Sequence, residues 1–540
     1  MMIAEGRTRT TALVLILLIA LALRLNNITF GLPSLWDPDE PIFMLIPLNM
    51  ITDRTLDPGW FGHPGSTTIY LIGLIDAAVA GFGLAIGRYP DIASFTRAAV
   101  ENPALLFMPV RVVMALIGVG TVWLTYSVGR RLQGPMTGLV AALLLAINAL
   151  HIAWSQVIRT DINASLLMMA CIAFSIRAYD RGRLRDFVIA GGFAGLATVT
   201  KWPAITVFVA VLGASVARGF DRRGLANIGA AGAALIGAMF VASPFIFIDW
   251  RTVLANLNGE ARPFHLAHTG AGFLSNLQFY AIFEIRSTMG WVGFAAFVAG
   301  AVLLARQSRA ARWTLIPATA AFLALISAQH LVWSRWVLPA LPAICIFAAA
   351  SAEALWRTIS RRMPRLNPAA VAAAVTAGLM IPSLLGSVDQ AIERANDTRG
   401  QAARWAEAHI PPGSTVVIEH LELSLRHQPW KFLFPIGRAG CIDGLNALSG
   451  GIHYQQVEQL RGGSPIVDLG NIPANRVKSC RADFAILTYY DLYKAEADHF
   501  PKELGIYHAI LAPGKTVALF APRPGRVGGP IVRIVALPQH

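Results

Sequence analysis

Three carboxylates stand close together at Asp37, Asp39 and Glu40, directly after the first long apolar segment of the chain. Such polar side chains do not fit inside a membrane span, because burying an unpaired charge in hydrocarbon is costly. Carboxylates at the exit of a span are therefore candidates for acid–base chemistry at a membrane surface. Asp37 precedes Pro38 and is predicted to be a turn residue. Asp39 and Glu40 are the stronger candidates.

Other ionisable groups recur at the ends of later apolar segments. Taken singly they have plain structural explanations: Arg111 and Arg335 can snorkel to the interface, and Asp161 can pair with Arg159 or cap a helix. Together, carboxylates beside cations suit a lipid phosphate, because cations stabilise a phosphate leaving group while a carboxylate accepts a proton. The candidates on the predicted outer face are Asp39, Glu40, His63, Arg111, His151, Arg159, Asp161, Lys201, His265, His268, His330 and Arg335.

The composition places the chain among polytopic helical membrane proteins. Of its 540 residues 55% are hydrophobic and 14% are charged, and the mean hydropathy is +0.54. The net charge of +14 falls in short loops, so it indicates membrane topology rather than nucleic-acid binding. No phosphate-binding loop, dinucleotide fingerprint, HExxH pattern or paired Cys/His pattern stands in a usable context, so a soluble nucleotide donor is not supported.

Apolar runs predict eleven transmembrane helices, each long enough for a hydrocarbon core of about 30 Å. The boundary between the fifth and the sixth is the weakest. The predicted spans are residues 11–30, 107–128, 135–153, 162–179, 187–202, 203–218, 225–247, 290–305, 313–329, 331–352 and 368–388.

Loop charge predicts the orientation of these spans. Six basic clusters fall on alternate loops, which the positive-inside rule makes cytoplasmic, together with the N-terminus. The first external loop, 31–106, and the long loop 249–289 then face outward. Residues 66–87 are apolar enough to span, but a span there would move five of the six clusters outside, so we expect a helix lying at the interface. The clusters begin at Arg7, Arg130, Arg177, Arg218, Arg306 and Arg357.

The chain changes character after about residue 389. Charged residues increase, and β-like runs occur at 415–419, 484–489, 516–520 and 531–535. The sequence therefore predicts a membrane domain over 1–388 and an extracytoplasmic α/β domain over 389–540. Cys441 and Cys480 can form a disulfide if this domain is extracytoplasmic, but the spacing leaves the pairing open.

The order of short motifs resembles the GT-C membrane glycosyltransferases of the protein O-mannosyltransferase and aminoarabinose-transferase type. The likeness covers nearly the whole chain, and the order of the motifs is more specific than any one of them. Gly65 replaces the second proline of an element that is otherwise similar. The matching residues are Arg24, Gly31–Pro33, Asp39-Glu40, Gly62–Gly65 with Thr68–Tyr70, Arg111, Tyr126–Arg131, Trp154–Gln156, Arg159–Asp161, Gly195–Ala197 with Thr200-Lys201, Arg335–Pro342, Arg404-Trp405 and Ile410–Ser414.

The resemblance implies a role for each matching site residue. Asp39 would be the catalytic base, Glu40 would position the acceptor, and Asp161 would be a supporting acid. Cations would hold the donor phosphate. Some relatives use a divalent metal ion and others do not, so the need for a metal stays open. The expected donor-phosphate or substrate-binding residues are His63, Arg111, Arg159, Lys201, His330 and Arg335.

The predicted function is an inverting transfer of a hexose or pentose from a polyprenyl-phosphate donor to a protein, lipid or glycan acceptor. It would take place on the outer face of a bacterial inner membrane. The alternative is a lipid-linked sugar flippase or transporter, which predicts inverted repeats and charges near the bilayer midplane. The sequence contains no such repeat, and its charges cluster at one face.

Overall fold

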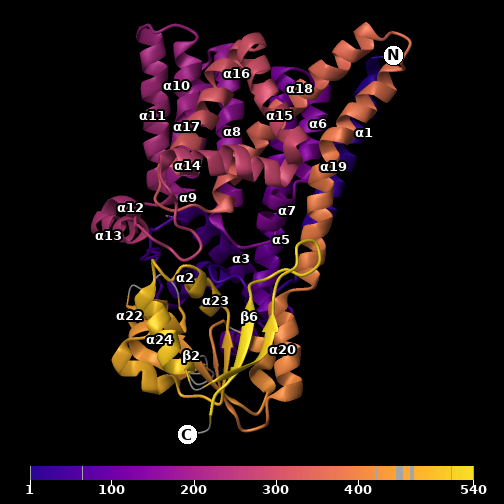
Figure 1. The fold of residues 1–540 in the computed structure, drawn as a ribbon. Helices are drawn as coiled ribbons and strands as arrows, with labels where there is room; N and C mark the ends of the chain where they lie inside the picture. Colours follow the sequence, from indigo (N-terminus) through magenta and orange to yellow (C-terminus); the bar gives the residue numbers. More distant parts are fainter. Residues whose placement is uncertain are drawn as a thin grey trace.

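A computed structural model shows a helical membrane domain with a smaller mixed α/β domain beneath it (Figure 1). The structure describes residues 2–63, 65–420, 422–444, 454–462, 467–512 and 514–538. The N-terminus lies at the end of the membrane domain that is remote from the α/β domain, and the C-terminus lies at the tip of the α/β domain. The fold predicted from the sequence, a polytopic helical membrane protein with a C-terminal α/β domain, is confirmed.

All eleven predicted spans are helical. Within the described residues, nine helices are long and apolar enough to cross a membrane: eight of the predicted spans, and Ser66–Ala85, which the sequence placed at the interface. One more predicted span is a pair of helices bent by 62°. Two predicted spans, at α9 and at η1 with α10, are shorter helices. The membrane-domain helices are α1 (Met2–Leu25), α5 (Ala104–Leu132), the bent pair α6 (Pro135–Ala146) and α7 (Ala149–Ser155), α8 (Thr160–Arg181), α9 (Leu184–Thr200), η1 (Trp202–Val207), α10 (Phe208–Val216), α11 (Arg222–Ala242), α15 (Ile285–Gln307), α16 (Arg309–Trp313), α17 (Leu315–Ser327), η3 (Ser334–Ala340), α18 (Leu341–Arg362) and α19 (Pro368–Ala395).

The prediction of a long loop up to Met289 is wrong. After α12 (Phe245–Ile248) and α13 (Trp250–Glu260), a helix begins at Phe273 and runs through α14 (Phe273–Gln278) and the π-helical η2 (Phe279–Glu284) into α15. Glu284 and Arg286 hid this helix because their charges interrupt the apolar run. In the fold Ser334 Oγ donates to Glu284 at 3.0 Å, and the guanidinium of Arg286 lies on aromatic rings.

The apolar helix α3 (Ser66–Ala85) has both of its ends on the side of the α/β domain. At its start, the hydroxyl of Ser66 is 2.7 Å from that of Ser243, which follows α11. After its end, α4 (Ile92–Glu101) contacts the α/β domain, where Arg426 Nη1 donates to the Val100 carbonyl at 3.5 Å. Figure 1 places α2 (Glu40–Thr52) and α3 between the two domains. These contacts support a helix at the membrane face.

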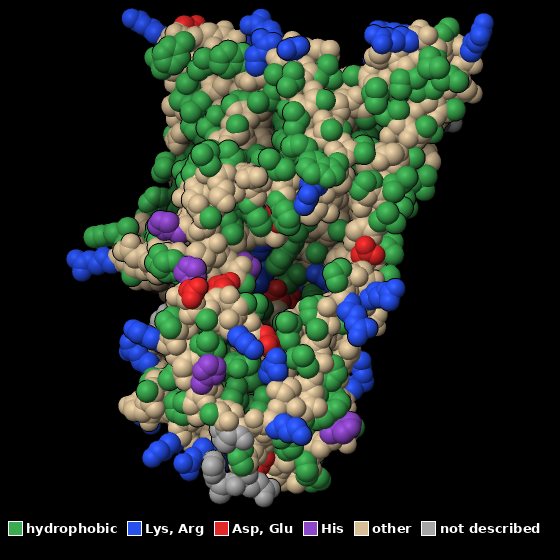
Figure 2. Space-filling model, viewed as in Figure 1, with side chains coloured by type: hydrophobic (Ala, Val, Ile, Leu, Met, Phe, Trp, Pro, Cys, Tyr) green, Lys and Arg blue, Asp and Glu red, His purple; other side chains and the backbone are tan. Residues whose placement is uncertain are grey.

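The basic loops meet at the opposite end of the membrane domain. Arg131 pairs with Asp180 at 2.6 Å, and Arg218 donates to the Tyr179 carbonyl at 2.5 Å, which joins three of the predicted basic clusters. Figure 2 shows Lys and Arg side chains along this end. The N-terminus and the basic loops therefore lie on the side remote from the α/β domain.

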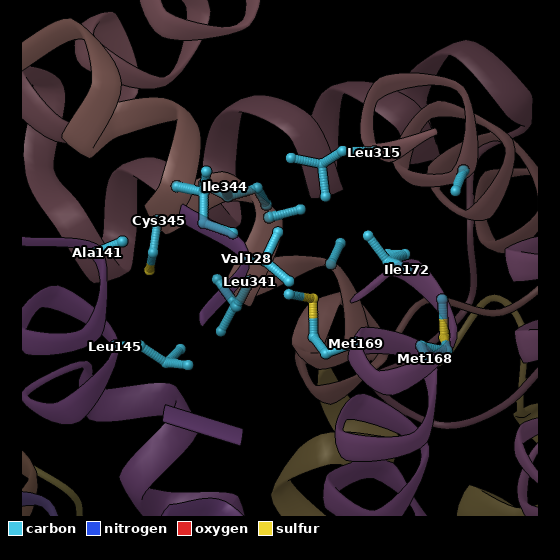
Figure 3. Packing of buried hydrophobic residues seen from close by; sticks show 14 of the residues in the cluster. Val128, Ala141, Leu145, Met168, Met169, Ile172, Leu315, Leu341, Ile344 and Cys345 are labelled. Atoms are coloured by element: carbon cyan, nitrogen blue, oxygen red, sulfur yellow. The ribbon is translucent and has the colours of Figure 1, made fainter. Parts of the chain in front are cut away.

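Close helix approach forms the core of the membrane domain. A Cβ atom on Gly191, Gly195 or Gly300 would meet the backbone of the neighbouring helix at less than 2.5 Å, so glycine is what allows these helices to touch. Figure 3 shows interlocking aliphatic and sulfur side chains from α5, α6, α8, α17 and α18. This rigid bundle fixes the helix ends from which the polar side chains project.

The α/β domain contains one six-stranded sheet in the order β3-β2-β1-β4-β6-β5. Strand β1 is parallel to β2 and β4, and the other pairs are antiparallel. All four predicted β-like runs contain strands, and Cys441 and Cys480 form a disulfide. The elements are α20 (Thr398–His409), β1 (Thr415–Ile418), η4 (Leu423–His427), β2 (Lys431–Ile436), η5 (Gly437–Ala439), β3 (Gly440–Asp443), α22 (Tyr454–Arg461), η6 (Leu469–Asn471), η7 (Ala474–Cys480), β4 (Phe484–Leu487), α23 (Tyr490–Ala495), α24 (Pro501–Leu511), β5 (Lys515–Phe520) and β6 (Val532–Ala536).

The carboxyl end of β1 faces the membrane domain. Glu422, four residues beyond this strand, accepts a hydrogen bond from Trp36 Nε1 at 2.9 Å. Because Trp36 precedes the acidic turn, the α/β domain lies against the candidate site.

Candidate active site

The acidic turn is held by its first carboxylate. Asp37 Oδ1 accepts the backbone N–H of Asp39 at 3.0 Å and that of Glu40 at 3.2 Å. Pro41 follows in the first turn of α2, where its missing N–H costs nothing. The predicted turn role of Asp37 is confirmed. Its carboxylate also pairs with Arg159 at 2.8 Å, a contact that the sequence did not indicate.

Glu40 and Arg111 form a fully buried pair behind this turn. Arg111 donates from Nε to Glu40 Oε1 at 2.9 Å and from Nη2 to Oε2 at 2.5 Å, and both side chains are 0% exposed. The Ile158 N–H donates to Glu40 at 2.9 Å, while Arg111 Nη1 also binds the carbonyls of Ile28 and Phe30. The pair ties α2 to α5 and to the segment before α8. Glu40 and Arg111 therefore hold the turn in place, and their buried side chains are not accessible to a substrate.

Asp39 is the accessible carboxylate of the turn. It pairs with Arg159, and Arg335 Nη2 lies 3.8 Å from its Oδ2, yet 32% of its side chain is exposed. Burial alone would raise the pKa of the Asp39 carboxyl. The positive charges of Arg159 and Arg335, with His63, outweigh that effect and lower the pKa to about 2. Asp39 is therefore ionised and reachable.

The second acidic site lies on the other side of Arg335. Asp161, in the first turn of α8, pairs with Lys201 at the end of α9, and both side chains are buried. Arg335 Nε lies 3.9 Å from Asp161 Oδ2. Arg335 therefore stands between Asp39 and Asp161 and joins the two acidic sites into one network. In Figure 2, acidic and basic side chains gather in the hollow between the two domains.

The two histidines that the resemblance assigns to substrate binding, His63 and His330, lie in different surroundings. His63 packs against Trp60 and Phe43, with ring centroids 5.3 and 6.4 Å apart. Burial lowers the pKa of His63, while the charges of Glu260 and Asp39 oppose this effect and that of Lys201 adds to it. His330 has an exposed side chain, and among the described contacts none joins that side chain to the network.

An aromatic and histidine group covers Arg335 from the outside. The Trp333 ring lies between the guanidinium of Arg335, 4.0 Å from its centroid, and the ring of His268, whose centroid is 3.4 Å away. Burial lowers the pKa of His268 to about 3, and the charges of His265 and Arg335 add to this. Trp154 faces both Arg159 and Arg335. In the sequence, Trp154 stands close to Arg159 and Trp333 close to Arg335. This pattern could have indicated that aromatic rings cover the cations.

The residues described do not fit a metal site in this arrangement. No group of three or more His, Cys, Asp or Glu side chains gathers in the described part of the chain. The aspartates of the network are instead paired with Arg159, Lys201 and Arg335. The arrangement can do two things: its cations can receive a phosphate, and the exposed oxygen of Asp39 can accept a proton.

Part of the chain matches a known protein family. Residues 105–248, less than half of the chain, match the family model of dolichyl-phosphate-mannose-protein mannosyltransferases. No curated protein matches the chain.

Solved structures match over nearly the whole chain. ArnT from Cupriavidus metallidurans is 15% identical, with 98% of this chain and 99% of that chain covered and a TM-score of 0.52. The oligosaccharyltransferase AglB from Archaeoglobus fulgidus, in complex with an inhibitory peptide and a dolichol-phosphate, is 13% identical over 94% of this chain and 73% of that chain, with a TM-score of 0.51. The apo archaeal oligosaccharyltransferase is covered over 62% of its length. The chain thus has the fold of ArnT and AglB, and its resemblance to the GT-C membrane glycosyltransferases is confirmed at the level of that fold.

Proposed function

We propose that this protein transfers a sugar from a polyprenyl-phosphate donor to an acceptor at the outer face of a membrane. The observation that carries the proposal is one accessible carboxylate, Asp39, beside two buried guanidinium groups. Arg335 connects it through Asp161 to Lys201. The family model matched by residues 105–248 and the dolichol-phosphate in the AglB structure support a lipid-phosphate donor.

The proposed reaction is a single displacement. The acceptor oxygen or nitrogen forms a bond to the anomeric carbon while the bond from that carbon to the phosphate oxygen breaks. The electron pair leaves with the polyprenyl phosphate, whose charge Arg159, Lys201 and Arg335 stabilise, and the acceptor proton moves to Asp39. Asp161 is engaged by Lys201, which leaves Asp39 as the base and supports inversion at the anomeric carbon.

Donor binding would activate Asp39. In the free protein the cations hold the pKa of its carboxyl at about 2, which makes it a weak base. A donor phosphate that draws Arg159 and Arg335 toward itself brings negative charge and weakens their pairing with Asp39. Both changes raise the pKa of Asp39. The carboxylate would therefore become a stronger base only when the donor is present.

We place the site on the outer face of a bacterial inner membrane. The basic loops lie on the opposite side of the membrane domain, as the positive-inside rule requires of a cytoplasmic face. The Cys441–Cys480 disulfide suits an oxidising compartment for the domain that we assign to residues 389–540. A reporter fused after residue 400 should then be active outside the cytoplasm, and one fused after Arg131 should not.

The function is tested with purified protein and a panel of labelled polyprenyl-phosphate hexoses and pentoses. We expect release of polyprenyl phosphate that depends on an acceptor, with inversion of the anomeric configuration in the product. Movement of intact lipid-linked sugar across vesicles without cleavage would overturn the proposal in favour of a flippase. Mass spectrometry of the panel would identify the sugar.

A further inference from the structure

Two segments of the α/β domain, the carboxyl end of β1 and the start of α20, both bind Trp36. It directly precedes Asp37, the residue whose carboxylate holds the backbone of Asp39 and Glu40. Every group that fixes Trp36 therefore also constrains the position of Asp39.

Glu422 binds the turn from the carboxyl end of β1. Its Oε2 accepts from Trp36 Nε1 at 2.9 Å, and its Oε1 accepts from the Ser34 hydroxyl. Ser424 donates to the same Oε1 at 2.8 Å. The Glu422 side chain is 3% exposed, so these are charge-assisted hydrogen bonds shielded from water.

Arg399, at the start of α20, holds the same tryptophan by its backbone and its ring. Arg399 Nη1 donates to the Trp36 carbonyl at 2.7 Å, and its guanidinium lies 4.8 Å from the ring centroid. Asp397 fixes Arg399 in turn, through contacts of 2.9 and 2.8 Å. The carbonyl contact fixes the peptide plane between Trp36 and Asp37.

Two glycines make room for the indole. A Cβ atom at Gly31, whose φ is +67°, would lie 3.0 Å from the Cβ of Trp36, and one at Gly400 would lie 3.4 Å from its ring. The membrane domain and the α/β domain thus each present a glycine to Trp36. This close fit leaves the indole little freedom.

We propose that Glu422 and Arg399 are positioning residues that act on Asp39 through Trp36, so that the α/β domain sets the geometry of the catalytic turn. This inference rests on the proposed function for its kinetic test. Loss of either contact would let the turn move, and a misplacement of the base lowers the rate of the chemical step more than it lowers donor binding.

The test is a double-mutant cycle between Glu422→Gln and Trp36→Phe. The phenylalanine keeps the ring and removes the Nε1 donor. We expect each variant to lower kcat about tenfold with little change in KM for the donor, and the double variant to be no slower than the worse single variant. Multiplicative losses, or an unchanged kcat in Glu422→Gln, would overturn the proposal.

Tyr493→Phe is the matched control. It removes a buried hydroxyl-to-carboxylate hydrogen bond of the same domain, 2.8 Å from Tyr493 Oη to Asp468, without touching Trp36. We expect it to lower thermal stability and leave kcat unchanged. A tenfold loss of kcat in this control would show that any weakening of the domain impairs turnover. That result would contradict a specific positioning role for Glu422 and Arg399.

Amide hydrogen exchange separates this inference from the proposed function. In Glu422→Gln, exchange of a peptide covering residues 36–43 should rise several-fold, because a loosened Trp36 lets Asp37, the acceptor of the Asp39 and Glu40 N–H groups, move. This result does not depend on activity. A wild-type protein without transferase activity would contradict the proposed function alone. Unchanged hydrogen exchange in Glu422→Gln would contradict the positioning role of Glu422.

Discussion

Two groups of carboxylates in this protein are stabilised in opposite ways. In the membrane domain Asp39 and Asp161 are paired with cations, and Arg335 lies between them. In the α/β domain Glu419 and Asp468 are held instead by hydroxyl and backbone N–H donors. The difference shows which of the two groups is able to exchange partners with a ligand.

The acids of the α/β domain belong to its framework. Glu419 follows β1 and accepts from the Tyr507 hydroxyl and from the N–H groups of Thr488 and Tyr489 at the end of β4. Burial, then the neighbouring Glu419, raises the pKa of Asp468 to about 7. Donors supplied by the fold cannot leave without unfolding the strand ends. The cations of the membrane domain can move toward a phosphate, because their side chains are long and flexible.

The largest expected effect is on Asp39. Asp39→Asn keeps the shape of the side chain and removes the proton acceptor, so kcat should fall by about 10³-fold, within the usual range for a general base. Release of labelled polyprenyl phosphate measures it. Asp53→Asn, on an exposed carboxylate of the same external segment, serves as the control and should retain full activity. Full turnover by Asp39→Asn would remove Asp39 from the mechanism.

Glu40 should affect stability more than chemistry. Glu40→Gln leaves Arg111 charged and buried without its counter-ion, which typically costs about 3–5 kcal/mol of unfolding free energy. Thermal unfolding in detergent should therefore show a clear decrease. A fully stable variant with a 10³-fold loss of kcat would instead return Glu40 to the role of contacting the acceptor.

Arg335 should control both donor binding and the basicity of Asp39. Its loss in Arg335→Gln removes a positive charge 3.8 Å from the Asp39 carboxylate, so the pKa of Asp39 should rise from about 2. KM for the donor should increase about tenfold. The acid limb of kcat at saturating donor, which reports Asp39 in the donor complex, should shift to higher pH. An acid limb at the wild-type position would mean that Arg335 does not influence Asp39.

The acidic residues of the site and the membrane face on which they lie could be predicted from short stretches of sequence. An unpaired carboxylate at the end of a membrane span destabilises the protein, so its presence indicates a function or a partner. This reasoning identified Asp39 and Asp161 as candidates. The loop charges placed both on one face. The same reasoning failed for residues 273–289, because hydropathy counts a charge as exposed even when, as for Glu284, a distant serine binds it.

The contacts of Trp36 with the α/β domain and of Glu40 with Arg111 were beyond prediction. Trp36 and Glu422 are separated by 386 positions, and nothing in either neighbourhood specifies the other. Glu40 shows the same limit, because its burial depends on Arg111, 71 positions away. Adjacent acids such as Asp39 and Glu40 are alike in sequence. Only the fold, which brings Arg111 of α5 behind the turn, buries Glu40 and leaves Asp39 partly exposed.

The smallest expected effect is on the pH dependence of stability in the α/β domain. The pKa of Asp468 is about 7 in the fold and about 3.9 when unfolded, so the folded state favours the protonated acid. Its contribution is therefore complete below about pH 4 and is lost as the pH rises through 7. We expect the wild-type melting temperature to fall by a few degrees between pH 5 and pH 8, and Asp468→Asn to flatten that slope. The asparagine can still accept from the Tyr493 hydroxyl, so the fold should persist. An equal slope in both proteins would mean that Asp468 stays ionised, and the contrast between the two groups of carboxylates would then disappear.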